Sequence, residues 1–145
     1  MLFRSDIHAH PNTRALCCAY SKDSRLLASG GWDGNVKIYD TESFNEVITI
    51  PHELRQSWIV SLDFSSCSLY LATGTSRPLV HIFEVSSGLE LFRFTDHTDC
   101  VGSLHFSSCG TLLASASSDE TVRIDRKSTR LNSSHSSVSR MPSSA

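Results

Sequence analysis

Three similar strands recur in this sequence at an almost constant spacing, and this spacing constrains the fold more than any other feature. Each candidate strand ends in an aromatic anchor, Tyr20, Phe64 or Phe106, and the anchors stand 44 and 42 residues apart. A unit of this length cannot bury its apolar faces alone, so it has to stack on its neighbours. The chain is therefore expected to consist of copies of one supersecondary unit.

Each unit is predicted to contain four short antiparallel strands. The anchor strand is followed by a polar hairpin and then by a strand of small residues, at 26–31, 70–75 and 112–117. A turn leads into a third strand, at 35–40, 79–84 and 121–124. Residues 46–50 and 90–94 supply a fourth strand in the first two units. Four short strands repeating every 40 to 45 residues or so are typical of the blades of a β-propeller.

The third strand of each unit alternates apolar and polar residues. A period of two indicates a strand that is buried more on one face than on the other. The apolar positions are therefore expected to face one buried side, and they are Val36, Ile38, Val80, Ile82, Val122 and Ile124. The residues between them are Lys37, His81 and Arg123.

The same units resemble the WD-repeat family over roughly residues 8–124. In that family a His precedes the first strand, a Ser or Thr lies in the small-residue strand, an Asp lies in a tight turn, and Trp-Asp ends the third strand. The first unit matches with His10, Ser29, Asp33 and Tyr39-Asp40. The third unit matches with His97, Ser115 and Asp119, and it reaches Ile124 where the Trp would come next.

The second unit departs from this pattern. It has His52 and Thr73, but Arg77-Pro78 stands where the Asp is expected, and Phe83-Glu84 ends its third strand. Arg77 is not a hydrogen-bond acceptor, so this unit is expected to lack the polar network of the family and to be the least rigid of the three.

The resemblance implies an all-β fold, a partial WD-repeat β-propeller with four-stranded antiparallel blades. Repeat 1 would cover residues 8–50, a degenerate repeat 2 residues 51–94, and a truncated repeat 3 residues 95–124, giving two complete blades and part of a third. Residues 1–7 resemble the outer strand of a neighbouring blade, which either precedes repeat 1 or is the last blade of the ring. Three blades do not close a ring, so the chain is expected to expose sheet faces and to fold poorly alone.

Residues 125–145 differ in character from the repeats. They contain eight Ser and no apolar periodicity, a composition typical of disorder. Residues 125–135 and 139–145 also resemble, in order and in frame, the translation of a common sequencing adapter, with residues 136–138 fitting its index. The segment is therefore predicted to be disordered and foreign to the protein. The alternative is a natural Ser-rich tail.

His10, Ser29 and Asp33 are the residue types of a hydrolase triad, and a serine hydrolase is therefore the alternative to a structural role. Ser29 lies in a small-residue strand without a GxSxG elbow, and the same set recurs at His97, Ser115 and Asp119. A single active site does not explain two copies. The resemblance implies instead a buried structural network made of His10, Ser29, Asp33, Tyr39, His97, Ser115 and Asp119. Tyr39 stands in for Trp and keeps a hydrogen-bond donor.

Composition argues against several other functions. Residues 1–124 carry a net charge of −5, which does not provide the positive field that nucleic acid binding needs. No apolar run reaches the length of a membrane span, and five cysteines without CxxC spacing fit free thiols in an intracellular protein, cytoplasmic or nuclear. The histidines lack metal-site spacing, and the GGWDG stretch leads into no helix, so neither a metal nor another cofactor is expected.

Trp32 is the strongest candidate for contact with a partner. It precedes the turn Asp, at a position that in the resembled family lies on the face where partners dock, and exposed Trp is enriched at binding hot spots. Trp58, Ser76 and Ser118 are weaker candidates on the same face. The competing interpretation is that Trp32 only packs over its own turn or the next blade. The expected function is a non-catalytic scaffold for protein or peptide partners, with an accessory propeller of a missing catalytic domain as an alternative.

Overall fold

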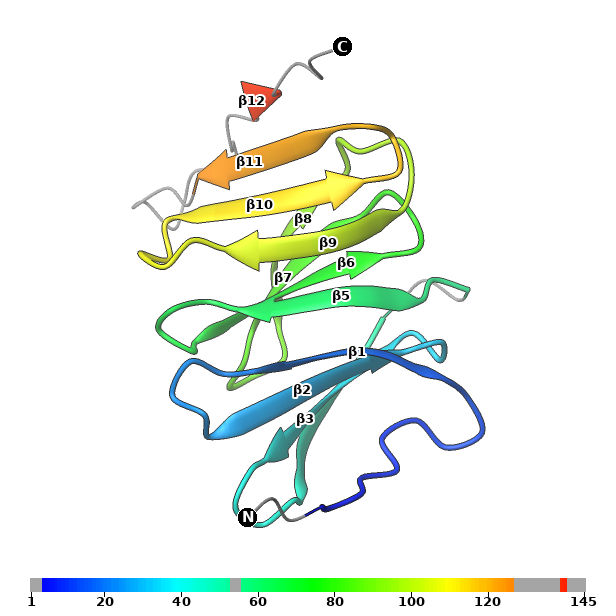
Figure 1. Ribbon diagram of the computed structural model, residues 1–145, viewed down its shortest axis with the longest axis vertical. Coiled ribbons are helices and arrows are strands. Elements are labelled where there is room, and N and C mark those ends of the chain that lie inside the picture. The colour runs from blue at the N-terminus through cyan, green and yellow to red at the C-terminus, as the bar shows by residue number, and fades with distance from the viewer. Residues whose placement is uncertain (1–3, 53–55, 127–138, 141–145) are drawn as a thin grey trace.

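The structure is a computed structural model that describes residues 4–52, 56–126 and 139–140, and it contains three antiparallel sheets (Figure 1). The first sheet has the strand order β1 (Ala15–Tyr20), β2 (Leu26–Gly31), β3 (Asn35–Asp40) and β4 (Glu46–Pro51). The second has the order β5 (Ile59–Phe64), β6 (Tyr70–Thr75), β7 (Val80–Glu84) and β8 (Glu90–Phe94). The predicted all-β fold with four-stranded antiparallel blades is confirmed.

The third sheet contains three strands of the repeat, β9 (Val101–Phe106), β10 (Leu112–Ser117) and β11 (Val122–Arg126). A two-residue strand, β12 (Ser139–Arg140), pairs with β11 at the outer position that β4 and β8 hold in the other sheets. Two details differ from the expectation for the tail: Asp125 and Arg126 continue β11, and residues 139–140 form a strand. The remaining residues of the tail lie outside the described part of the chain.

The sheets stack face to face, with β1, β5 and β9 following one another along the long axis (Figure 1). The larger core lies between the first two sheets, where Ile38, Ile59, Phe64 and Leu71 are fully buried. These residues come from strands of both sheets, so neither sheet could bury them without the other. The spacing of the aromatic anchors therefore predicted the stacking unit correctly.

A smaller core lies between the second and third sheets. Val80 from β7 and Val101 and Leu104 from β9 are buried there, and Phe94 and Phe106 pack around them. The outward face of the third sheet has no further sheet against it within the described residues.

The expected burial of the third strands holds in the first unit and for Val80 in the second, which is fully buried, but it fails in the third. Val36 and Ile38 are fully buried because they face the second sheet. The counterparts in β11 behave in the opposite way: Val122 is 42% exposed, whereas Arg123 is buried. Val122 faces away from the second sheet, so the apolar side of β11 is left uncovered. His81 is also buried, because both faces of β7 lie between neighbouring sheets.

Polar side chains of the inner strands connect neighbouring sheets at equivalent positions. The Cys17 thiol donates to the carbonyl of Ile59 over 3.5 Å, and the Ser61 hydroxyl donates to the carbonyl of Val101 over 3.2 Å. These side chains occupy the same position in β1 and β5, pairing with Gly30 and Gly74 respectively. The repeat therefore fixes the offset between sheets as well as the strands within them.

Asp63 adds a second link that reaches all three sheets. Its Oδ2 accepts the backbone N–H of Phe106 in β9 over 2.7 Å, and its Oδ1 accepts from the Lys22 ammonium over 3.4 Å. Asp63 is buried in β5, so these bonds compensate for its loss of hydration.

Residues 4–7 of the proposed N-terminal outer strand adopt no strand, and residues 1–3 lie outside the described part of the chain. The proposed repeat and tail boundaries remain predictions.

The two outer sheet faces make a testable prediction. Leu16 and Tyr20 in β1 and Val122 in β11 expose 39%, 61% and 42% of their surface, so the chain should aggregate or bind a hydrophobic dye. Leu16→Glu and Val122→Glu should each lower the dye fluorescence, because a charge interrupts the apolar face. Val47→Glu is the matched control, since Val47 is 58% exposed on an outer strand. A sharp monomeric melt without dye binding would contradict the prediction.

Candidate functional site

The structure brings three predicted residues of the first unit into one hydrogen-bonded chain. His10, in the loop before β1, places Nδ1 2.9 Å from Asp33 Oδ1 and Nε2 3.0 Å from the Ser29 hydroxyl. The Tyr39 side chain also hydrogen-bonds to Ser29. The imidazole is buried and the carboxylate is partly exposed. The connection ties the loop before β1 to the turn between β2 and β3.

The third unit repeats the arrangement. His97 places Nδ1 2.8 Å from Asp119 Oδ2 and Nε2 2.9 Å from the Ser115 hydroxyl. Asp119 also accepts the backbone N–H groups of Thr98 and Thr121. Its carboxylate therefore holds both the loop before β9 and the turn before β11.

Both turn carboxylates are favoured in their ionised form. Desolvation opposes ionisation of Asp33, but hydrogen bonds from His10 and from the backbone of Asn35 outweigh it and lower the pKa of Asp33. In Asp119, desolvation is likewise outweighed by hydrogen bonds from Thr121, Thr98 and His97, and the pKa lies well below its usual range. The two networks therefore stay intact at neutral pH.

The connectivity from Asp through His to Ser is that of a hydrolase triad, but the surroundings of the serines are those of a packed strand. Ser29 and Ser115 are 7% and 1% exposed, and both lie inside β-strands paired on two sides. A nucleophile has to reach a substrate carbonyl, which requires exposure. This geometry suits a structural network that fixes two loops.

The second unit holds its turn in a different way. Thr75 donates to the carbonyls of Arg77 and Leu79 over 2.9 and 3.3 Å, and so closes the turn that Asp closes in the other units. The Thr73 hydroxyl, at the position of Ser29 and Ser115, is buried without a hydrogen bond. The role of Thr75 was not anticipated, although a Thr just before an Arg-Pro turn was visible in the sequence.

His52 does not take the place of His10. Its ring packs edge-on against His81 with centroids 4.0 Å apart, and its Nε2 is buried without a hydrogen bond. Burial, together with the charge of His81, lowers the pKa of His52 to about 4. The neutral ring acts as an apolar side chain against Phe83.

Residue 125 occupies the position of an aromatic residue. In the strand register, Asp125 pairs with Leu113, as Tyr39 pairs with Leu27 and Phe83 with Leu71. The side chain is buried, and its Oδ1 has no hydrogen bond. Burial, followed by the nearby negative charge of Asp96, raises its pKa to about 6. A carboxylate is poorly suited to this position.

The loop face carries a group of exposed aromatic residues. Trp32 stacks on Trp58 with ring centroids 4.8 Å apart and an interplanar angle of 17°. The Arg14 guanidinium lies over the Trp32 ring, 4.5 Å from its centroid. The two Trp residues still expose 38% and 41% of their surface. Trp32 thus packs on the next blade, as the competing interpretation supposed, and remains accessible as well.

The same backbone hydrogen bond supports the loop face in each unit. The turn residue donates its N–H to the carbonyl of the residue before the inner strand, in the pairs Trp32 to Arg14, Ser76 to Trp58 and Ser118 to Cys100. Ser76 also accepts the N–H of Trp58 on its hydroxyl over 3.0 Å. Ser76 therefore positions Trp58 and is itself half-buried, whereas Ser118 is exposed.

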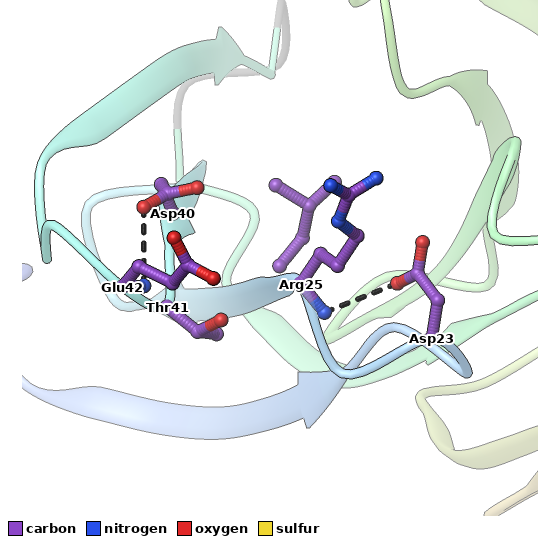
Figure 2. A pocket seen from close by; sticks show the side chains of 6 residues that line it. Asp23, Arg25, Asp40, Thr41 and Glu42 are labelled. Atoms are coloured by element: carbon purple, nitrogen blue, oxygen red, sulfur yellow. Dashed lines mark hydrogen bonds between the residues drawn. The ribbon is translucent and has the colours of Figure 1, made fainter.

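A pocket of about 330 Å³ lies at the opposite end of the first sheet (Figure 2). Its lining includes Asp23, Arg25, Asp40 and Glu42. Asp23 accepts the backbone N–H of Arg25, and Asp40 accepts that of Glu42, as the dashed lines of Figure 2 mark. The carboxylates thus stabilise their own turns, which leaves them few free acceptors for a ligand.

Two further features bear on the function. Over residues 4–52, 56–126 and 139–140, no group of three or more His, Cys, Asp or Glu side chains is arranged to hold a metal ion. The same residues include no helix that is long and apolar enough to cross a membrane.

Comparison with known families identifies the class of protein. The family described as "WD domain, G-beta repeat" matches residues 3–40 and 88–124. These ranges make up just over half of the chain, so the chain belongs to the WD40 repeat family. Most of repeat 2, which lacks the turn Asp, falls between the two matched ranges.

Individual relatives agree with this assignment. The chain is 36% identical over 69 residues to an uncharacterized WD repeat-containing protein of Schizosaccharomyces pombe, with 48% of this chain and 11% of the relative covered. It is 40% identical over 55 residues to the ciliary WD repeat-containing protein ctxp80 of Euplotoides octocarinatus, with 38% and 7% covered. The chain therefore matches only about a tenth of the length of these relatives.

Two solved structures share the fold. One contains the WD40 repeats of RRP9 and the other is U3-55K, and each superimposes with a TM-score of 0.75 at 27% identity. In both cases the match covers 79% of this chain and 36% of the solved chain. The three sheets thus form part of a WD40 propeller.

The misplaced carboxylate at residue 125 makes a prediction about stability. Asp125→Tyr should raise the free energy of unfolding by about 1–3 kcal/mol at pH 7, because it removes a buried unpaired acceptor and allows a bond to Ser115 like that of Tyr39 to Ser29. Asp125→Asn is the matched control, which removes the charge without adding a ring and should gain less. Denaturant unfolding measures the difference, and a Tyr variant no more stable than the parent chain would contradict it.

A second prediction concerns pH. The pKa of His52 in the folded chain is lowered, so the unfolded chain binds this proton more readily. The free energy of unfolding should therefore fall as the pH drops from about 6.5 to 4. The pKa of Asp125 in the folded chain is raised to about 6, so protonation of this side chain should increase the free energy of unfolding as the pH falls from 6 to 4. The two trends oppose each other, and the parent chain should change little over this range.

Single variants should separate the two trends. Acidification from pH 6.5 to 4 should destabilise Asp125→Tyr and stabilise His52→Leu, each by about 1–2 kcal/mol, an amount reduced by partial exposure to solvent. Melting temperatures across this pH range provide the measurement. Parallel pH profiles for the two variants would show that neither group carries the effect.

Proposed function

We propose that this chain is a non-catalytic segment of a WD40 propeller that holds protein or peptide partners on its loop face. The observation that supports this most is the Trp32–Trp58 stack, which spans two blades and stays exposed. Exposed aromatic residues on a rigid support are enriched among the residues that dominate binding energy. Trp32 and Trp58 would make the contact, Ser76 would orient Trp58, and Ser118 would lie at the edge of the surface.

The His, Ser and Asp networks support this proposal through rigidity. Asp33 follows Trp32 directly and is bonded to His10 and to the N–H of Asn35. The turn that carries Trp32 is therefore fixed before any partner arrives, which lowers the entropy lost on binding. His10, Ser29, Asp33 and Tyr39 would act as structural residues in blade 1, as would His97, Ser115 and Asp119 in blade 3.

A protein ligand is favoured over nucleic acid because residues 1–124 carry a net charge of −5. All five cysteines are free, which suits a reducing compartment and supports an intracellular location, in the cytoplasm or nucleus. No cofactor is part of the proposed function. A catalytic domain elsewhere in a longer protein is compatible with this role, because the propeller would then be its accessory binding module.

Affinity capture with matched variants tests the proposal. The 145-residue chain should retain partners from cell extract that the Trp32→Ala/Trp58→Ala variant loses. Leu69→Ala is the control, because Leu69 is 59% exposed in the hairpin at the opposite end of the second sheet. Equal capture by all three proteins would contradict the proposed surface. Labelling of Ser29 by a fluorophosphonate probe would contradict the non-catalytic role.

A further inference from the structure

The stacked arginine on the loop face has chemistry that the Trp pair alone does not supply. Arg14 and Trp58 both contact the ring of Trp32, at 4.5 and 4.8 Å from its centroid. Arg14, Trp32 and Trp58 therefore form one cluster centred on the Trp32 ring.

Arg14 lies against the Trp32 ring, and its guanidinium donates no hydrogen bond to another residue in the described part of the chain. Its backbone carbonyl accepts the N–H of Trp32 over 2.9 Å, which ties the residue to the turn. Arg14 is exposed, and among the described residues no carboxylate lies within ion-pair distance of it. Other arginines differ: Arg4 pairs with Asp6 and Arg93 pairs with Glu90.

The carboxylate closest to this stack in sequence is already engaged. Asp33 follows Trp32, but it is bonded to the His10 ring and to the backbone N–H of Asn35. The Asp33 carboxylate therefore stabilises its own turn and does not pair with Arg14. A guanidinium lying flat on an aromatic ring still presents its N–H groups at the edge, in the geometry that matches a carboxylate or a phosphate.

We propose that Arg14 recognises an anionic side chain of the partner, and that Trp58 receives an apolar side chain of the same segment. This inference rests on the proposed function and specifies its ligand as a short extended peptide with one acidic and one apolar residue. The guanidinium and the Trp58 ring both lie against Trp32, so they are at most about 9 Å apart, a distance within reach of two to three residues of extended chain. Because successive side chains of an extended chain point to opposite sides, the acidic and apolar residues are expected two positions apart, where both face the surface.

Labelled peptides that carry Glu and Phe two positions apart provide the test, with binding to the 145-residue chain measured by fluorescence anisotropy. Replacing the peptide Glu by Gln, or making the protein variant Arg14→Gln, should each weaken binding about 10-fold. Combining the two changes should weaken it little further, because both remove the same contact. Arg25→Gln is the matched control, since Arg25 lies at the other end of β2.

Further peptides distinguish the sources of the anion. A phosphoserine peptide that binds at least as well as the Glu peptide, and is equally sensitive to Arg14→Gln, supports the same anion site with phosphate as its ligand. Competition by inorganic phosphate alone at the concentration of the peptide would overturn the requirement for a peptide. Unchanged affinity in Arg14→Gln, or additive effects of the two Gln changes, would overturn the role of Arg14.

A spectroscopic control separates this inference from the proposed function. Stacked indoles give an exciton couplet in circular dichroism, so the couplet reports whether Trp32 and Trp58 are assembled in each sample. If Trp58→Ala abolishes peptide binding while Arg14→Gln has no effect, the anion site is overturned and the Trp platform stands. If the couplet is present and no acidic peptide binds, the anion site is again overturned, and the capture experiment decides the platform independently.

Discussion

Packing between adjacent sheets is the interaction on which the rest of this structure depends. Ile38 and Ile59 are fully buried, and they come from different sheets. Burial of such a side chain contributes roughly 1.5–3 kcal/mol, which one four-stranded sheet with a solvated face does not obtain. The polar links from Cys17 and Ser61 then set how far one sheet is offset from the next. Each blade is therefore ordered by packing against the blades next to it.

The sequence predicted the parts of the fold that repeat. The spacing of Tyr20, Phe64 and Phe106 places three equivalent inner strands, and the structure has β1, β5 and β9 there. Burial was predicted less well, because it depends on position in the stack. Phe64 is fully buried between two sheets, whereas Tyr20, at the equivalent position, is 61% exposed on an outer face. The periodic pattern encodes the direction of a side chain and leaves open what covers it.

The polar network and the aromatic stack differed in how far the sequence could predict them. His10, Ser29 and Asp33 could be grouped because the same residue types recur as a set in another unit. The Trp32–Trp58 contact joins residues that are not equivalent in the repeat, and it depends on the orientation of two rings from different blades. Arg14 had no sequence signal, since a lone Arg before a strand is common on any surface.

These observations place rigidity and recognition in the same part of the first blade. Asp33 is the residue after Trp32, so the bonds that hold the Asp33 carboxylate also hold the backbone that carries the indole. The N–H of Trp32 in turn fixes the backbone of Arg14. The second blade contributes Trp58 but has no such network, since Thr73 and His52 leave polar atoms without a hydrogen bond. Stacking on Trp32 therefore adds to the order that the bonds with Ser76 give Trp58 within its own blade.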